Sequence, residues 1–121
     1  MHYLIILIVS LLLSPQITFG AEFRLVQQPA PVNVGDTFVV ILTLRTDADS
    51  VNAIEGSLRF SPELALVSTR FEGSLVPLWI IFPAEKEIGT VPFAGVLPGG
   101  YRGTGDIFTL VFKAVKKGTA R

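Results

Sequence analysis

Three stretches of the chain alternate between apolar and polar or β-branched positions with a period of two. They lie at 37–45, 51–60 and 107–115, and each carries large apolar side chains on one face. This period, together with many β-branched residues, is typical of strands that bury one face. The predicted core positions are Phe38, Val40, Leu42, Leu44, Ile54, Leu58, Phe60, Phe108, Leu110, Phe112 and Ala114.

Shorter apolar runs between turn-forming residues predict further strands at 23–27, 64–69, 75–82 and 90–96. The polar run 46–50 and the glycine-rich run 98–106 are interpreted as loops. No stretch after residue 20 shows the 3.6-residue period of a helix. About seven short strands with Gly and Pro between them predict an all-β fold, an antiparallel β-sandwich of two sheets around one core.

The N-terminus has the layout of a secretory signal peptide. The apolar run 3–13 is shorter than the ~20 residues that span a membrane, and Thr18 and Gly20 are small residues suited to cleavage before Ala21. No Lys or Arg precedes the run, which departs from the usual pattern. We therefore expect a signal peptide at 1–20 and one domain at 21–121; an uncleaved anchor and a buried N-terminal segment are the alternatives.

Charge and composition exclude several classes of function. The chain has ten basic and ten acidic side chains, whereas nucleic-acid binders carry a positive excess. It has no Cys, and its single histidine, His2, lies in the predicted signal peptide. The mature domain therefore lacks the residues for Ser-His-Asp or Cys-His nucleophiles, Cys/His zinc sites and haem ligation. Carboxylate acid–base chemistry and calcium binding by oxygens remain open.

Three segments in order resemble a bacterial cohesin domain: 32–40 (VNVGDTFVV), 56–68 (GSLRFSPELALVS) and 98–120, which ends in LVFKAVKKGTA. The resemblance implies a jelly-roll sandwich that captures a dockerin, a small calcium-dependent module on secreted enzymes. It also implies a role in placing polysaccharide-degrading enzymes on a scaffold.

Two features depart from the family pattern. The family continues beyond the point where this chain stops, so we expect the final strand to be missing and a sheet edge to be unpaired. Many cohesins carry an Asn-x-Asp pair on the partner-facing strand; the matching positions here are Ala53 and Glu55.

The candidate partner-binding residues follow from the predicted strand faces. Glu55, Ser57 and Arg59 alternate along one strand and form a polar row. Thr109 and Val111 lie on the predicted outer face of the last strand, together with Ile107. Because Ile107 and Val111 are apolar, we expect this face to be covered by a partner or by further chain. The alternative for the polar row is an ordinary solvated sheet face.

Other candidate sites are weaker. Trp79 and Tyr101 could stack on sugar rings, although the apolar surroundings of Trp79 favour the core. Asp47 and Asp49 could begin a calcium site but lack enough neighbouring oxygens, and Asp36 is interpreted as a turn residue bonded to nearby N–H groups. A glycosidase pair of Glu85 and Glu87 would sit in a short turn without a cleft.

Together these observations predict a secreted or cell-surface module that binds a dockerin-like partner, with no enzymatic activity, cofactor or metal. Direct carbohydrate binding and a structural adhesion module of a larger surface protein are the alternatives. Contact with a membrane is expected only through the signal peptide or an anchor beyond Arg121.

Overall fold

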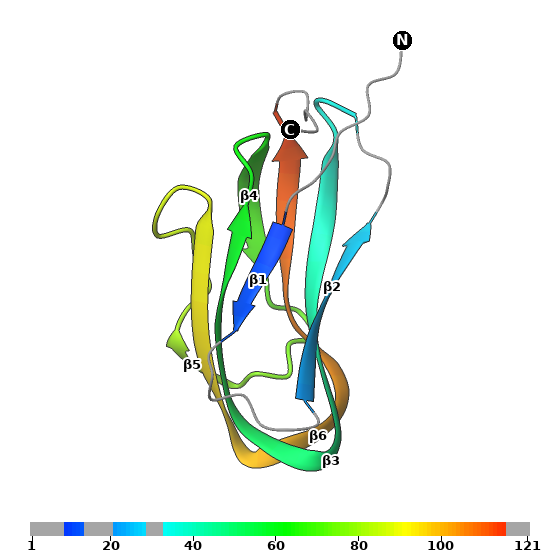
Figure 1. The fold of residues 1–121 in the computed structure, drawn as a ribbon, viewed down its shortest axis with the longest axis vertical. Coiled ribbons are helices and arrows are strands. Elements are labelled where there is room, and N and C mark those ends of the chain that lie inside the picture. Colours follow the sequence, from blue (N-terminus) through cyan, green and yellow to red (C-terminus); the bar gives the residue numbers. More distant parts are fainter. Residues whose placement is uncertain (1–8, 14–20, 29–32, 116–121) are drawn as a thin grey trace.

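The computed structural model describes residues 9–13, 21–28 and 33–115; side-chain burial is described for 21–28, 33–47 and 50–115. Within these residues all regular structure is β, and six strands form one antiparallel sheet (Figure 1). Because no helix is present there, none is long and apolar enough to cross a membrane. The strands are β1 (Val9–Leu13), β2 (Ala21–Gln28), β3 (Thr37–Phe60), β4 (Leu64–Arg70), β5 (Leu78–Ile81) and β6 (Thr90–Ala114).

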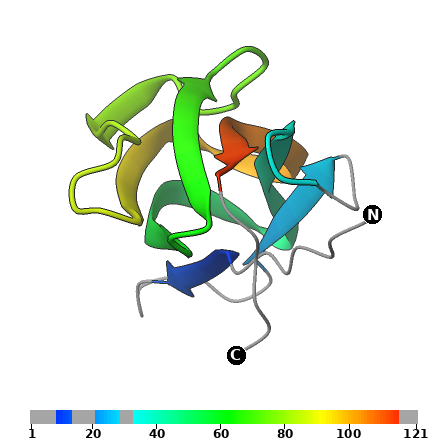
Figure 2. The same ribbon diagram turned by 90° about the horizontal axis from the view of Figure 1, so that it is seen from above.

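Two long strands, β3 and β6, pair along nearly their whole length and organise the sheet. The first half of β3 pairs with the second half of β6, and residues 51–59 pair with 90–101. β1 and β2 pair with the other edge of β3, whereas β4 and β5 pair with the other edge of β6. The sheet curls around its own inner face as a half-barrel, as the view from above shows (Figure 2).

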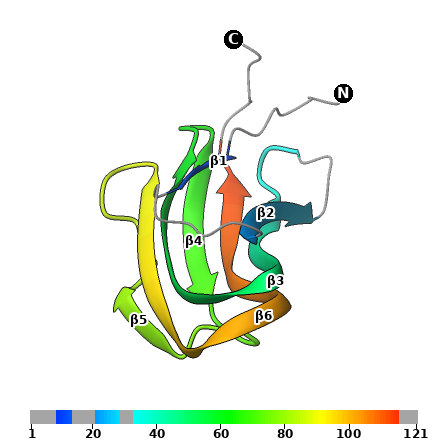
Figure 3. The ribbon, with the colours of Figure 1, turned by 60° about the horizontal axis from the view of Figure 1, so that its bottom comes forward.

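The predicted loops at 46–50 and 98–106 are wrong, because both runs lie within the long strands. They face each other where β3 and β6 turn a corner together (Figure 3). The pairing register shifts there on both sides of Val51, and Gly99, Gly100 and Gly103 have positive φ. Bulges and glycines bend a strand without ending it. Four predicted strands are therefore two continuous ones.

The buried side chain of Thr46 links β3 to β6 at this corner by hydrogen bonds. Its side chain is 5 % exposed, and its Oγ1 accepts a hydrogen bond from the Gly103 N–H at 2.8 Å. The same hydroxyl donates to the Tyr101 carbonyl at 3.5 Å. The buried threonine hydroxyl thus bonds two backbone groups of β6 at a point where the strand pairing is irregular.

Replacing Thr46 by valine is expected to lower the free energy of unfolding by about 1–2 kcal/mol, because the half-buried Gly103 N–H loses its acceptor. Thr46→Ser keeps the oxygen and is the control. Chemical denaturation of both variants checks this, and equal midpoints for wild type and Thr46→Val would contradict it.

The core lies on the concave face of the sheet, where the period-two pattern predicts it. All of the core positions named from the sequence are buried except Phe60, which is half-buried and packs against the others. The Phe112 ring lies 4.9 Å from Phe60 and 5.7 Å from Phe38, while Phe93 lies 5.3 Å from Phe108. The antiparallel all-β prediction is therefore confirmed, as one curled sheet instead of two separate sheets.

The apolar run near the N-terminus contributes β1. Val9–Leu13 pairs antiparallel with Gly56–Phe60 of β3, with Val9 opposite Phe60 and Leu13 opposite Gly56. This edge of β3 is thus occupied by β1, whereas the unpaired edge expected from a missing final strand concerns chain beyond the described residues and stays a prediction. The rest of the predicted signal peptide, and the predicted cleavage point after Gly20, lie outside the described residues. Cleavage stays a prediction, and it would remove β1.

Candidate binding surface

The outer face of the sheet beyond the corner combines residues from three strands, and we call it the β3–β6–β5 face. Glu55 and Ser57 of β3 stand opposite Ala94 and Pro92 of β6, so their side chains share one face. On the other side of β6, β5 continues the same face, with Leu78 opposite Val96 and Ile81 opposite Ala94. The face is formed by Glu55, Ser57, Arg59, Pro92, Ala94, Val96, Leu78, Ile80 and Ile81.

Three parallel rows of different chemistry make up this face. The β3 row is polar, with Glu55 and Arg59 exposed, and the β6 row consists of half-buried apolar side chains of moderate size. The β5 row is large and apolar: Leu78 is 53 % exposed and Ile80 is 65 % exposed. Exposed apolar side chains on the same face as a charged row are typical of a surface that contacts another molecule.

A bulge in β5 explains the exposure of its apolar residues. The register shifts between Trp79 and Ile81, so Ile80 has no opposite residue on β6. Trp79 turns to the inner side, where its ring lies 6.2 Å from Phe108 and 5.9 Å from Phe71. This aromatic packing holds β5 against the core, while Leu78 and Ile80 on either side of Trp79 face outwards. Sequence reasoning placed the whole run 75–82 in one apolar strand and missed this division.

The two proposed sugar-stacking aromatics are both half-buried, and the structure does not bring them together. Trp79 packs inwards from β5, which agrees with the alternative that it is a core residue. Tyr101 stands opposite Val51 in the corner of β6 and packs against the core. The glycine-rich run that contains Tyr101 was predicted to be a loop, but it belongs to β6, and Tyr101 is half-buried there.

Thr109 and Val111 lie in the other half of the sheet from Glu55, Ser57 and Arg59. Thr109 stands opposite Ile41 and Val111 opposite Val39, whereas the polar row pairs with the beginning of β6. Val111 is only 8 % exposed, and Ile107 is fully buried. Ile107 is the residue of β6 left without a partner at the register shift between Leu42 and Thr43. Both apolar side chains are buried within this chain. The expectation that a partner or further chain must cover them is therefore wrong.

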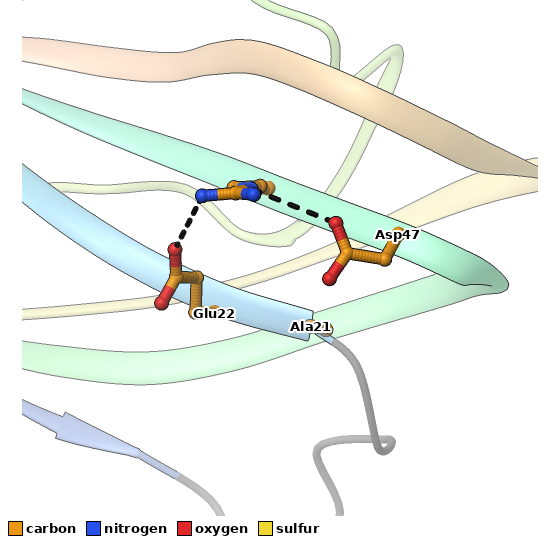
Figure 4. A pocket seen from close by; sticks show the side chains of 4 residues that line it. Ala21, Glu22 and Asp47 are labelled. Atoms are coloured by element: carbon orange, nitrogen blue, oxygen red, sulfur yellow. Dashed lines mark ion pairs between the residues drawn. The ribbon is translucent and has the colours of Figure 1, made fainter.

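A small charged cavity of about 270 Å³ lies beside the start of β2, lined by Ala21, Glu22, Arg45 and Asp47 (Figure 4). The Arg45 guanidinium lies 3.6 Å from a carboxylate oxygen of Glu22 and 3.6 Å from one of Asp47. These side chains are about half exposed or more, so the pairs contribute little to stability. Asp47 is engaged with an arginine, and the Asp49 side chain lies outside the described part.

The remaining acidic candidates lie in turns, where they take part in local hydrogen bonds. The Asp36 carboxylate accepts a hydrogen bond from the Asn33 N–H at 3.2 Å, which confirms it as a turn residue. Glu85 accepts the Gly89 N–H at 2.9 Å, whereas Glu87 bridges to Thr90 through the backbone. Across the described residues, no three His, Cys, Asp or Glu side chains gather in a way that could hold a metal ion.

The chain was compared with protein-family models, curated proteins and solved structures. No family model, curated protein or solved structure matches it. The fold therefore rests on the strand pairing described above, and the cohesin resemblance on the quoted segments alone.

Proposed function

We propose that this chain is a non-catalytic, exported binding module that captures a partner protein on its β3–β6–β5 face. The observation that carries the proposal is the exposed apolar row of β5, at Leu78 and Ile80, on the same face as the charged row of β3, with β6 between the two rows. Burying the apolar row would supply binding free energy, at roughly 25 cal/mol per Å² of apolar surface. Glu55 and Arg59 carry opposite charges and would orient the partner.

The cohesin resemblance supplies the class of partner, a dockerin-like module on a polysaccharide-degrading enzyme. The fold is compatible with this proposal, since an antiparallel sheet with one buried face can present the side chains of its other face to a partner module. The finer jelly-roll assignment belongs to the same proposal. Localisation outside the cell or at its surface follows if residues 1–20 direct export.

The test is binding of immobilised chain to a panel of dockerin modules, with calcium and with a chelator. We expect Ile80→Asp to weaken binding at least tenfold, because it places a charge in the centre of the apolar row. Ile88→Asp is the matched control: Ile88 is 98 % exposed and lies in the turn before β6, outside the face.

Three results would contradict the proposal. The first is calcium-independent binding, and the second is equal loss of binding in the two aspartate variants. The third is a folded Glu55→Ala, Ser57→Ala, Arg59→Ala triple variant that binds as tightly as wild type, which would remove the polar row from the site. Retention on insoluble polysaccharide, unchanged by the chelator, would instead indicate direct carbohydrate binding.

A further inference from the structure

The edge of β3 over Glu55–Phe60, which we call the β3 edge, accepts an added strand. In the full chain β1 pairs there, from Gly56 to Phe60. On its other side the same stretch is already paired with β6. Any process that removes or displaces β1 therefore leaves this stretch of β3 as a sheet edge with unpaired backbone groups. Such an edge is a template for pairing with another chain.

The direction of the backbone groups at this edge follows from one hydrogen bond. The Phe60 N–H donates to the Gly89 carbonyl at 2.9 Å, so Phe60 directs its backbone towards the β6 side. Backbone groups alternate in direction along a strand. Arg59, Ser57 and Glu55 therefore direct their N–H and C=O groups towards the β1 side. These three residues would form the hydrogen-bonded pairs with any antiparallel strand placed there.

The sequence of the β3 edge is complementary to itself. If two copies pair antiparallel with Ser57 opposite Ser57, each Glu55 stands opposite the Arg59 of the second copy. Both charged side chains are exposed on the outer face, and neither is in an ion pair with another described residue. Opposite charges directly across an antiparallel pair are favourable, and like charges are unfavourable. The same three residues also supply all the edge-directed backbone groups.

We propose that the β3 edge, when β1 is not paired with it, joins the β3 edge of a second copy in a two-fold symmetric dimer with Ser57 on the axis. The two sheets then become one continuous sheet, β6–β3–β3–β6, across the dimer. A second copy fits better than an arbitrary strand, because it places an arginine opposite each Glu55 and a glutamate opposite each Arg59. The added interface is one short strand pair, so we expect reversible association in the micromolar to millimolar range.

The first experiment compares the full chain with the chain starting at Ala21, by sedimentation velocity over a range of concentrations. We expect the full chain to remain monomeric, because β1 occupies the β3 edge, and the shorter chain to dimerise. Circular dichroism and Trp79 fluorescence report whether the shorter chain is folded. A shorter chain that is unfolded or monomeric at every concentration would overturn the proposal, since a second copy would then fail to take the place of β1.

Charge reversal then locates the interface. In the shorter chain, Glu55→Arg and Arg59→Glu each place like charges opposite one another twice per dimer, and each should weaken dimerisation about tenfold. The double swap, Glu55→Arg with Arg59→Glu, restores opposite charges and should restore the dimer. Glu72→Arg, an exposed reversal outside the β3 edge, is the control. A dimer unchanged by the single reversals, or not restored by the swap, would overturn the proposal.

The dimer and the proposed partner binding are tested separately. Ile80 lies on β5, away from the β3 edge, so Ile80→Asp should leave dimerisation of the shorter chain unchanged while it weakens partner binding at least tenfold. The double charge swap should also keep the dimer, but it exchanges the charges of the polar row on the β3–β6–β5 face, so it is used to test dimerisation only. Failure of the shorter chain to dimerise would overturn the dimer proposal alone. Partner binding that Ile80→Asp leaves unchanged would overturn the binding proposal alone.

Discussion

Replacing Phe112 by alanine is expected to lower the free energy of unfolding by about 3–5 kcal/mol. Phe112 is fully buried and lies where three strands meet, opposite Phe38 of β3 and Leu66 of β4. Its ring packs 5.7 Å from that of Phe38 and 4.9 Å from that of Phe60. Truncation removes this contact area and leaves a cavity that rigid strands cannot close. Urea denaturation followed by Trp79 fluorescence measures the loss.

Phe82→Ala is the matched control for this prediction. Phe82 is 56 % exposed, and its ring lies 4.5 Å from that of Phe71 and 6.4 Å from that of Trp79. Losing these two partly exposed aromatic pairs is expected to cost about 1–2 kcal/mol. Because a small domain is stable by only ~5–15 kcal/mol, the Phe112 variant should be close to unfolding at 37 °C. Similar losses in the two variants would mean that the core is not where the sheet places it.

Replacing Gly89 by alanine is expected to lower the free energy of unfolding by about 2–3 kcal/mol, for two reasons that add. Gly89 has a φ of 81°, which L side chains rarely adopt. A Cβ there would also lie 2.9 Å from the Phe60 carbonyl oxygen, a backbone atom that has little freedom to move. The turn holds the beginning of β6 against the end of β3 through the Phe60 N–H to Gly89 carbonyl bond.

Gly73→Ala separates the two contributions. Gly73 has a similar φ of 74°, but a Cβ there would meet nothing within 4 Å. Its substitution should therefore show the conformational cost alone, about 1 kcal/mol. Thermal and urea unfolding of both variants give the difference. An equal loss at the two positions would contradict the predicted clash with Phe60.

The prediction from sequence was strongest where structure depends on local alternation. The faces of β3 and β6 follow the period of two, so Phe38, Leu42, Leu58 and Phe108 are all buried as predicted. Alternation is a property of the single strand and needs no knowledge of its neighbours. The turn function of Asp36 could be predicted for the same reason, because its bond to Asn33 spans only three residues.

Predictions failed where bulges shift the alternation. Ile107 lies in an alternating run and should face outwards, but it is the residue of β6 left without a partner at the register shift between Leu42 and Thr43, and it is buried. The glycine-rich run around Tyr101 has the composition of a loop, yet it continues β6 through a corner. Composition reports which backbone conformations are allowed, and glycine allows both a loop and a bent strand.

The candidate site was predicted in part. The polar row at Glu55, Ser57 and Arg59 was found from sequence because it alternates on one strand. The apolar row of β5 was missed, because exposure at Ile80 depends on a bulge that only pairing with β6 reveals. A hydrophobic run bounded by prolines gave no signal that half of its side chains would face outwards.

By itself, the sequence determined that this chain forms antiparallel strands, that the alternating apolar residues of β3 and β6 face the core, and that the region after residue 20 contains no His or Cys for chemistry. Only the tertiary structure decided that the strands are continuous through a corner, that Val111 is covered while Ile80 is exposed, and that Val9–Leu13 pairs with β3. The physical reason is that a strand's own pattern fixes the direction of its side chains, whereas burial and edge pairing depend on the strands lying beside it.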